Sequence, residues 1–144
     1  IIYVERTSSG RSLVRVVYLV GGRAPLHLTS VGKLFLAADG VADVRAYARR
    51  TGLPGKTPHS LTRIDVLEKE LDKIRRHEVA YDNEEAEVGL RCVAAPIRND
   101  EGQLVAGLSI SAPTDRHSPD WVAPIKATAN QISQALGYRR PLRK

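Results

Sequence analysis

Helical spacing of hydrophobic positions is the first pattern along this chain. Residues 31–38 are mostly apolar and follow Thr29 and Ser30, which are typical N-cap residues, so we expect a short helix there. A second helix is expected over 41–50, because Gly52 follows it as a typical C-terminal stop. The pattern therefore predicts two successive short helices in the first third of the chain.

Two further helices are predicted by stripes of apolar residues three or four positions apart. The first stripe follows Thr62 and Asp65, which have the spacing of a capping box. Its members are Ile64, Leu67, Leu71 and Ile74. The second helix is expected to begin at Ser118 and Pro119, an N-cap followed by proline, and to end at Gly137. Its buried positions are expected to be Val122, Ile125, Ala129, Ile132 and Leu136.

Strands are predicted where short apolar runs lie between turn signals. Residues 1–5 and 13–20 are expected to form two strands. Residues 89–97 and 103–112 are expected to form a hairpin around the turn at 99–102. Helices interspersed with an antiparallel hairpin are typical of an α+β domain, in which helices pack on a mostly antiparallel sheet.

The predicted hairpin divides its side chains between two faces of the sheet. The expected partners are Arg98 with Gln103, Cys92 with Ser109, and Leu90 with Ser111. One face is apolar, apart from Arg91 at its far end, and belongs to the core: Val93, Ala95, Ile97, Leu104, Ala106, Leu108 and Ile110. The other face carries mostly small residues away from the turn, namely Leu90, Cys92, Ala94, Gly107, Ser109 and Ser111, with Pro96 and Val105 nearer the turn.

The small-residue face has two interpretations. Small side chains with hydroxyl and thiol groups suit the concave floor of a pocket for a small molecule. Small side chains also allow a helix to pack closely against the strands. The hairpin pattern alone favours neither interpretation.

Composition narrows the class of protein. The chain has 144 residues, of which 42% are hydrophobic and 26% charged, the balance of one globular domain. No apolar run approaches the roughly 18 residues of a membrane span, and we recognise no signal peptide. The single cysteine excludes an internal disulfide and a multi-cysteine zinc site. Because the chain contains no methionine, we expect it to be a fragment of a longer protein.

The formal net charge of +6 is a weak indication of nucleic-acid binding, because the excess is concentrated at one end. Four of the 22 basic residues lie within 139–144, and removing them leaves 18 basic against 16 acidic residues, a net charge of +2. Only 5% of residues are aromatic, which disfavours stacking on single strands. We therefore do not expect this segment to bind nucleic acid directly.

Two candidate chemical features remain: Cys92 and the helix start at 29–33. A catalytic thiolate needs a nearby histidine, and only His27 falls close to the expected pocket, with no spacing typical of cysteine enzymes. We therefore expect Cys92 to be a contact residue. The free N–H groups at a helix start attract carboxylates, and Gly32 would let a ligand approach the backbone closely.

Several motifs together resemble the C-terminal effector-binding domain of IclR-type transcriptional regulators. They are PLHLTSVGK at 25–33 followed by Leu36 and Ala37, YDNEE at 81–85, GLRCVAAPI at 89–97, and Gly102 followed by AGLSISAP at 106–113. Each motif is moderately specific, but their order and spacing make the set specific, and the likeness covers essentially the whole chain. The departures are small: His77 and Ala112 stand where the family commonly has glycine.

The resemblance implies a GAF-like fold and a cytoplasmic bacterial regulator. Such proteins join this module to an N-terminal winged helix-turn-helix domain that binds DNA. They assemble as homodimers or homotetramers and bind small organic or aromatic carboxylic acids. We therefore expect residues 1–138 to form the effector-binding domain, without its first elements, and 139–144 to form a basic tail. The DNA-binding domain would be absent from this chain.

The resemblance also implies a set of effector contacts. They fall here on Leu13, Val16, Ser30, Val31, Asp82, Leu90, Cys92, Ser109 and Ser111, and Gly32 joins them from the helix-start argument. The expected mechanism is ligand-linked regulation without catalytic residues, metal ions or cofactors. Two rival functions remain open: a GAF-like redox enzyme that uses Cys92, and an oligomerisation module that binds no ligand.

The charge distribution generates a first prediction. The 144-residue chain should show no sequence preference for DNA, because its body is nearly neutral and contains no recognisable helix-turn-helix segment. A gel-shift assay on the DNA upstream of its own gene, at moderate salt, checks this. Discrimination of ~1000-fold over random DNA would contradict the prediction.

Overall fold

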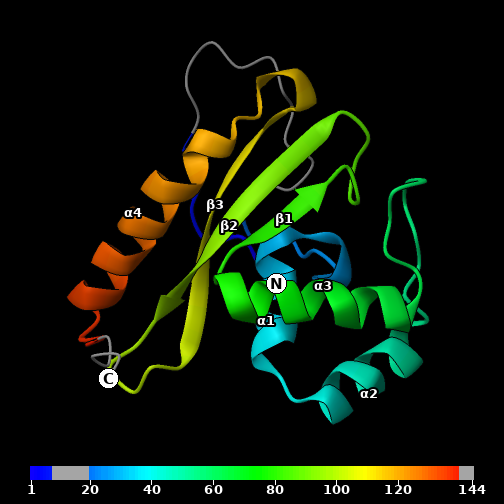
Figure 1. Ribbon diagram of the computed structural model, residues 1–144, viewed down its shortest axis with the longest axis horizontal. Coiled ribbons are helices and arrows are strands. Elements are labelled where there is room, and N and C mark those ends of the chain that lie inside the picture. Colours follow the sequence, from blue (N-terminus) through cyan, green and yellow to red (C-terminus); the bar gives the residue numbers. More distant parts are fainter. Residues whose placement is uncertain (8–19, 140–144) are drawn as a thin grey trace.

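Among residues 1–7 and 20–139, which the computed structural model describes, four α-helices surround a three-stranded antiparallel sheet (Figure 1). The elements are η1 (Leu26–Leu28), α1 (Ser30–Ala38), α2 (Val41–Thr51), α3 (Ile64–His77), β1 (Ala80–Asn83), β2 (Leu90–Arg98), β3 (Leu104–Pro113), η2 (Thr114–Arg116), η3 (Pro119–Trp121) and α4 (Val122–Ala135). This is the α+β class that the hydrophobic pattern predicts.

The helix boundaries follow the sequence signals closely, except at the start of α3 and the end of α4. α1 begins where the Thr29 hydroxyl accepts a hydrogen bond from the N–H of Gly32 at 3.1 Å. α2 ends at Gly52, which adopts the left-handed conformation with φ of 70°. The predicted capping box before α3 is wrong, because Arg63 is the N-cap residue and makes no side-chain cap. Its guanidinium instead holds the Asp65 carboxylate at 2.9 Å.

The last helix begins with the predicted serine cap. Ser118 caps the 3₁₀ turn η3, and α4 follows directly. Ile125 and Ala129 are buried, as the apolar stripe predicts. Leu136 is 50% exposed, so its predicted burial is wrong. The reason is that α4 ends at Ala135, before the stripe reaches this residue.

The N-terminal residues do not form the strand predicted over 1–5. Only Ile2 makes a β-bridge, with Arg23. The backbone hydrogen bonds of this segment to described residues join Ile1 and Tyr3 to residues 21–24 and stop before Val4, so the pairing is too short to form a strand. The strand predicted over 13–20 lies outside the described residues, apart from Val20 in a turn.

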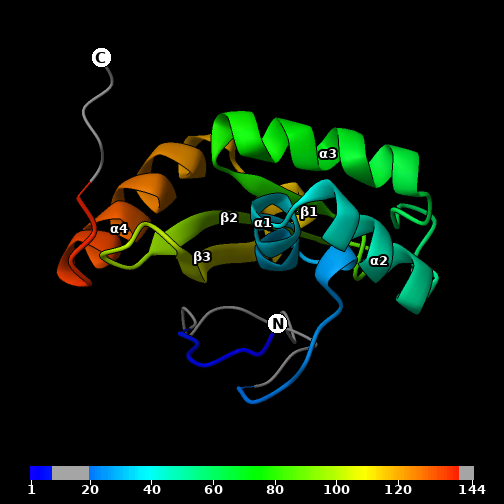
Figure 2. The same ribbon diagram turned by 90° about the horizontal axis from the view of Figure 1, so that it is seen from below.

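The sheet has the order β1-β2-β3, with β2 in the centre. The sequence pattern missed β1, which is short and pairs only with residues 91–94 of β2. α4 lies on one face of the sheet and α1 on the other, and α3 packs on α1 (Figure 2). Both faces are therefore covered, and the domain has two layers of core.

Each layer has its own cluster of buried side chains. The layer under α4 contains the predicted apolar face of the hairpin: Val93, Ala95 and Ile97 pack with Val79, Ile125 and Ala129. The layer under α1 is larger and brings together the buried residues of α1, α2 and α3 with Ala80 and Ala94 of the sheet. The small-residue face is thus a second packed face over part of its length.

The register of the hairpin differs from the predicted one by two residues. Cys92 lies opposite Ser111, and Ser109 lies opposite Ala94. Leu90 lies opposite Pro113. Because side chains alternate with a period of two, a shift of two residues leaves each of them on its predicted face.

The shift has two sources near the turn, a longer turn and an extra residue in β3, and each contributes one residue. The register changes between Ile97 and Arg98, and Arg98 pairs with Leu104 in place of Gln103. The extra residue is Val105, which is 46% exposed. Leu104 consequently packs against the α1 cluster, so its predicted place on the α4 face is wrong.

One close contact between α1 and the sheet is made at a glycine, Gly107 of β3. A Cβ atom on Gly107 would lie 2.7 Å from Cγ1 of Val31 and 3.0 Å from its Cγ2. Gly107 therefore allows the first turn of α1 to approach β3 closely. Of the two interpretations of the small-residue face, the packed helix holds for this part of it.

This contact generates the second prediction. Gly107→Ala should destabilise the chain by roughly 1–3 kcal/mol, because Val31 is stiff at χ1 and has little room to move. The midpoint of urea unfolding measures the change. The double variant Gly107→Ala with Val31→Ala should recover part of the loss. Equal stability of Gly107→Ala and the parent chain would show that α1 is seated elsewhere.

Candidate functional site

A small pocket lies where the start of α1 meets the sheet and the loop after β1. Six of the residues predicted from the sequence line it together: Ser30, Asp82, Leu90, Cys92, Ser109 and Ser111. Its volume is about 20 Å³, which is room for about one water molecule. The small-residue face therefore borders a cavity at this end of the strands, and its role as a floor for a small molecule stays a prediction.

Sequence reasoning missed four lining residues: Tyr3, Thr29, Ala86 and Glu87. Thr29 belongs to the helix start at 29–33 that the sequence singles out, but it is not among the predicted contacts. Ala86 and Glu87 follow directly after the YDNEE motif, whose position could have pointed to them. Nothing in the local sequence around Tyr3 indicates a place in a pocket, because it reaches the site through the tertiary fold alone.

The floor of the pocket is a row of partners across all three strands. Asp82 on β1 lies opposite Cys92 on β2, which in turn lies opposite Ser111 on β3. The Ser111 hydroxyl donates to the Cys92 sulfur at 3.1 Å, and the Cys92 thiol lies 3.9 Å from Oδ2 of Asp82. The three side chains therefore form one connected polar line.

Two predicted residues, Val31 and Gly32, do not line the pocket. Val31 packs against Gly107, as described above. A Cβ atom on Gly32 would lie 2.4 Å from the carbonyl oxygen of Leu26, so glycine is needed there for the contact between η1 and α1. Gly32 is therefore required for packing at this position, not for the approach of a ligand to the backbone. Leu13 and Val16 lie outside the described residues.

Asp82 is the most constrained acid of the pocket. Its side chain is buried, and Oδ1 accepts hydrogen bonds from the N–H groups of Glu85 at 2.8 Å and Ala86 at 3.3 Å. Burial raises the pKa of the Asp82 carboxyl, although these hydrogen bonds and the charge of Lys33 act in the opposite direction. Oδ2 faces the Cys92 thiol.

Behind Asp82 lies a buried ion pair that sequence reasoning missed. Lys33 of α1 is fully buried, and its Nζ donates to Oε1 of Glu85 at 2.6 Å. Burial raises the pKa of the Glu85 carboxyl, and the charge of Lys33 counteracts this. The available sequence signal was a lysine inside the apolar run 31–38, because such a lysine must be paired if it is buried.

The Cys92 thiol has the wrong electrostatic setting for a nucleophile. Burial and the negative charge of Asp82 raise its pKa to about 12. A reactive cysteine needs an electropositive neighbourhood that lowers the thiol pKa. The thiol is therefore a neutral hydrogen-bonding group at physiological pH, in line with its predicted role as a contact residue.

His27 does not line the pocket, although its sequence position suggested a place near it. Its ring is fully buried, with Nδ1 2.8 Å from the Tyr47 hydroxyl and Nε2 3.1 Å from the carbonyl oxygen of Pro54. Since a carbonyl only accepts, Nε2 carries the proton. Burial lowers the pKa of His27, so the ring is a neutral structural link between η1 and α2.

Two further properties of the described residues bear on function. No group of three or more His, Cys, Asp or Glu side chains within them is arranged to hold a metal ion. None of the helices in this part of the chain has the length and apolar character needed to cross a bilayer.

Comparison with known sequences identifies relatives of this chain. Residues 1–134 match the family described as bacterial transcriptional regulator IclR C-terminal. The chain is 37% identical over 142 residues to the HTH-type transcriptional regulator KdgR of Dickeya chrysanthemi, covering 96% of the chain and 46% of that regulator. It spans about half the length of the curated relatives it matches. These relatives are named as transcriptional regulators or repressors, not as enzymes.

Solved structures share the fold. The transcriptional regulator YaiJ gives a TM-score of 0.88 at 27% identity, covering 94% of this chain and 78% of that chain. The inducer-binding domain of PobR from Acinetobacter, a double mutant in complex with 3-hydroxybenzoic acid, gives a TM-score of 0.75 at 29% identity, covering 80% of this chain and 69% of that chain.

The thiol environment generates the third prediction. Iodoacetamide should alkylate Cys92 at pH 8 at least about 100-fold more slowly than a free cysteine, because a pKa of about 12 leaves very little thiolate. Mass spectrometry follows the reaction. Asp82→Asn should accelerate it, since the charge of Asp82 raises the thiol pKa.

Glu101→Gln is the matched control for this experiment. It removes a carboxylate from the exposed hairpin turn and should leave the alkylation rate unchanged. Alkylation of the parent chain as fast as a free cysteine would reopen the nucleophile interpretation.

Proposed function

The chain belongs to the family of bacterial IclR C-terminal domains, and on this premise we propose that it is the effector-sensing domain of a transcriptional regulator. Its effector is a small carboxylic acid that binds in the pocket between the start of α1 and the sheet. The observation that carries the proposal is the convergence of helix start, serine hydroxyls and Asp82 in one pocket.

The carboxylate of the effector belongs at the start of α1. Ser30 lines the pocket, its N–H has no carbonyl partner within the helix, and the helix dipole favours an anion there. The Ser109 hydroxyl reaches the same space from β3, and the Ser111 hydroxyl becomes a second donor when it turns away from the Cys92 sulfur. These groups offer hydrogen bonds to an anion without a charged side chain.

Asp82 selects for a second group on the effector. A carboxylate next to Asp82 would be repelled, so the acid group must lie away from it. Its Oδ2 lies 3.9 Å from the Cys92 sulfur. In the complex, this oxygen accepts a hydrogen bond from a hydroxyl group of the ligand. A hydroxylated acid satisfies both ends of the pocket, and the related PobR domain is named in complex with such an acid.

Binding requires the pocket to widen. A volume of about 20 Å³ is far smaller than an organic acid, so the walls must separate when the effector enters. The effector therefore stabilises a wider conformation, and it shifts the assembly state only if its affinity differs between states. We propose a homodimer or homotetramer in the bacterial cytoplasm, in which DNA is bound by a domain outside this chain.

The small volume of the pocket is also compatible with the rival function, an oligomerisation module that binds no ligand. The two functions differ in one measurement, because such a module would not be stabilised by any acid. The redox-enzyme rival is disfavoured by the raised pKa of Cys92.

The fourth prediction tests the pocket directly. The parent chain should be stabilised in a thermal-shift assay by at least one acid of a small panel consisting of 3-hydroxybenzoate, pyruvate and glycolate. An acid at 100 times its dissociation constant stabilises by about 2.7 kcal/mol. Ser109→Phe should abolish the response, because the new ring fills the space between β3 and α1.

Thr128→Phe is the control, since it adds the same ring at an exposed position of α4. It should respond to the acid as the parent chain does. A folded Ser109→Phe chain that binds the acid with the affinity of the parent chain would contradict the pocket assignment. No response of the parent chain to any acid would favour the ligand-free module.

A further inference from the structure

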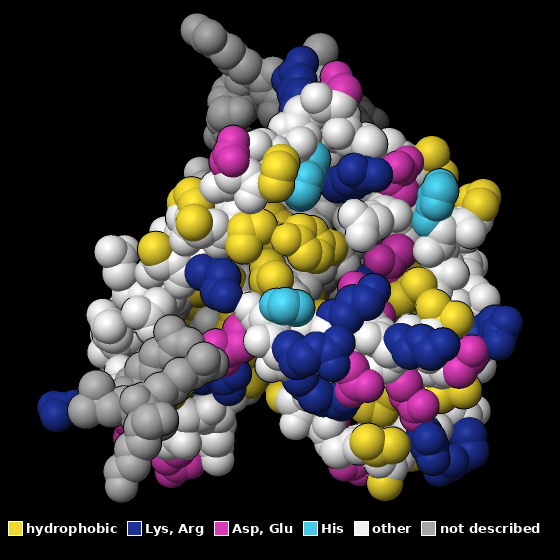
Figure 3. Space-filling model, viewed as in Figure 1, with side chains coloured by type: hydrophobic (Ala, Val, Ile, Leu, Met, Phe, Trp, Pro, Cys, Tyr) yellow, Lys and Arg dark blue, Asp and Glu magenta, His cyan; other side chains and the backbone are white. Residues whose placement is uncertain are grey.

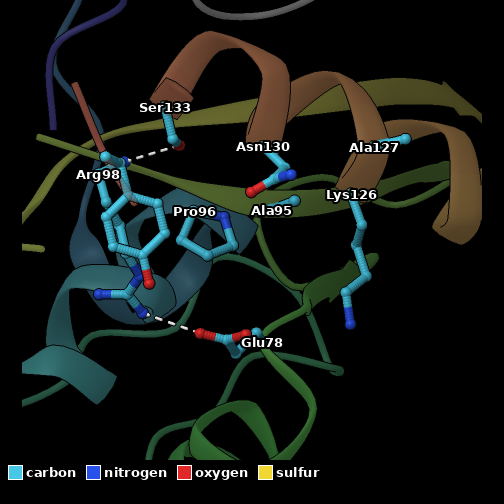
Figure 4. Close-up of a pocket in the computed structure, with 9 residues that line it drawn as sticks. Glu78, Ala95, Pro96, Arg98, Lys126, Ala127, Asn130 and Ser133 are labelled. Carbon is cyan, nitrogen blue, oxygen red and sulfur yellow. Dashed lines mark hydrogen bonds and ion pairs between the residues drawn. The ribbon is translucent and has the colours of Figure 1, made fainter. Parts of the chain in front are cut away.

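A second cavity, of about 230 Å³, lies at the other end of β2 from the pocket (Figure 4). α4 contributes Lys126, Asn130 and Ser133 to its walls, β2 contributes Pro96 and Arg98, and Glu78 lies at the end of α3. Figure 3 shows this face of the molecule, with a hollow between α4 and α3 that has charged side chains of both signs at its rim. None of these residues lines the pocket at the start of β2.

The cavity exists because β1 is short. β1 pairs with β2 no further than Ala94, so the edge of β2 over 95–98 has no strand beside it among the described residues. The N–H of Arg98 on this edge donates to the Ser133 hydroxyl at 3.0 Å, and Pro96 has no N–H. A peptide strand cannot extend the sheet here, because the edge has no donor left to offer it.

α4 turns a polar stripe toward this gap. Lys126, Asn130 and Ser133 are spaced to share one face of the helix. The Ser133 hydroxyl accepts the hydrogen bond from the Arg98 N–H, and Lys126 Nζ donates to the carbonyl oxygen of His77 at 2.8 Å. Asn130, between them, makes no hydrogen bond to any described residue, and Figure 4 shows its amide pointing into the cavity. Its donors and acceptor are therefore available to a ligand.

The charges around the cavity favour an anion. The Arg98 guanidinium is occupied by the Glu78 carboxylate at 3.1 Å and the carbonyl oxygen of Gly102 at 3.1 Å. Lys126 has no carboxylate partner among the described residues. These three side chains carry a net charge of +1, and the unmatched charge is that of Lys126.

We propose that this cavity is a second ligand site, which takes a small carboxylate that also carries a hydrogen-bond donor. The carboxylate faces Lys126 and the Asn130 amide N–H. The donor, an amide N–H or a hydroxyl, reaches the Pro96 carbonyl on the free edge of β2. The volume equals that of about seven or eight water molecules, so the ligand has about as many non-hydrogen atoms.

N-acetylglycine is a probe of this size that has both groups. It is titrated into the 144-residue chain, and ¹H–¹⁵N NMR follows the Asn130 side-chain amide and the Arg98 backbone amide. We expect saturable shifts of both signals. N-acetylglycinamide, which lacks the negative charge, should bind at least about tenfold more weakly, because a charge-assisted hydrogen bond is lost.

Two variants test the residues of the site. Lys126→Met should weaken binding at least about tenfold, whereas Lys69→Met, on an exposed face of α3, should leave it unchanged. Asn130→Asp keeps the side-chain shape and should abolish binding by placing a carboxylate opposite the ligand. In these variants the Arg98 backbone amide reports binding.

The outcomes separate this proposal from the pocket at the start of β2. Ser109→Phe should leave the N-acetylglycine shifts unchanged, so failure of the proposed effector site does not affect this result. Shifts that do not saturate mean a cavity filled by water only and overturn the proposal. Parent-like affinity in Lys126→Met or in Asn130→Asp overturns it as well.

Discussion

The ion pair between Lys33 and Glu85 joins α1 to the loop after β1, and the shape of the pocket depends on it. The two charged atoms are 2.6 Å apart and both side chains are buried, so neither charge is screened by water. Removing Lys33 would leave the Glu85 charge buried and unpaired, which typically costs about 3–5 kcal/mol, whereas removing Glu85 would leave Lys33 with only the longer contact to Glu70 at 3.9 Å. Ser30 at the start of α1 and Asp82 before the loop are thereby held on opposite sides of one cavity. The pair also limits how the pocket opens, because α1 and the loop must move together unless the pair breaks.

The same face of the hairpin serves two purposes along its length. Gly107 lets Val31 approach the strands, which fixes the start of α1 over the sheet. Ser109 and Ser111, which follow Gly107 on the same face of β3, are also small, but they border a cavity. Small residues are needed in both places, for contact in the first and for space in the second. This is why the sequence pattern supported two interpretations, close packing and open space, and why the face contains both.

β2 organises the rest of the domain because β1 covers only part of it. Where β1 is present, Asp82 and Cys92 lie side by side and belong to the pocket under α1. Where β1 does not reach, side chains of α4 lie beside the edge of β2, and the Ser133 hydroxyl accepts a hydrogen bond from the N–H of Arg98. The substitution leaves a polar cavity, because side-chain groups spaced along a helix cannot match every backbone group along a strand edge.

The sequence by itself determined the helices, the α+β class and the faces of the hairpin, because these depend on local spacing and on a period of two. Cys92, Ser109 and Ser111 fell on one face even though the predicted register was wrong by two residues. Only the tertiary structure decided the register itself, since a turn one residue longer than predicted and an extra residue at Val105 together set it. It also decided the partner of Lys33, because Glu85 is distant in the chain. It decided the role of Gly32 as well, because η1 folds back against the start of α1. Contacts of this kind leave no periodic signal in the sequence, so they become visible only when the elements are packed together.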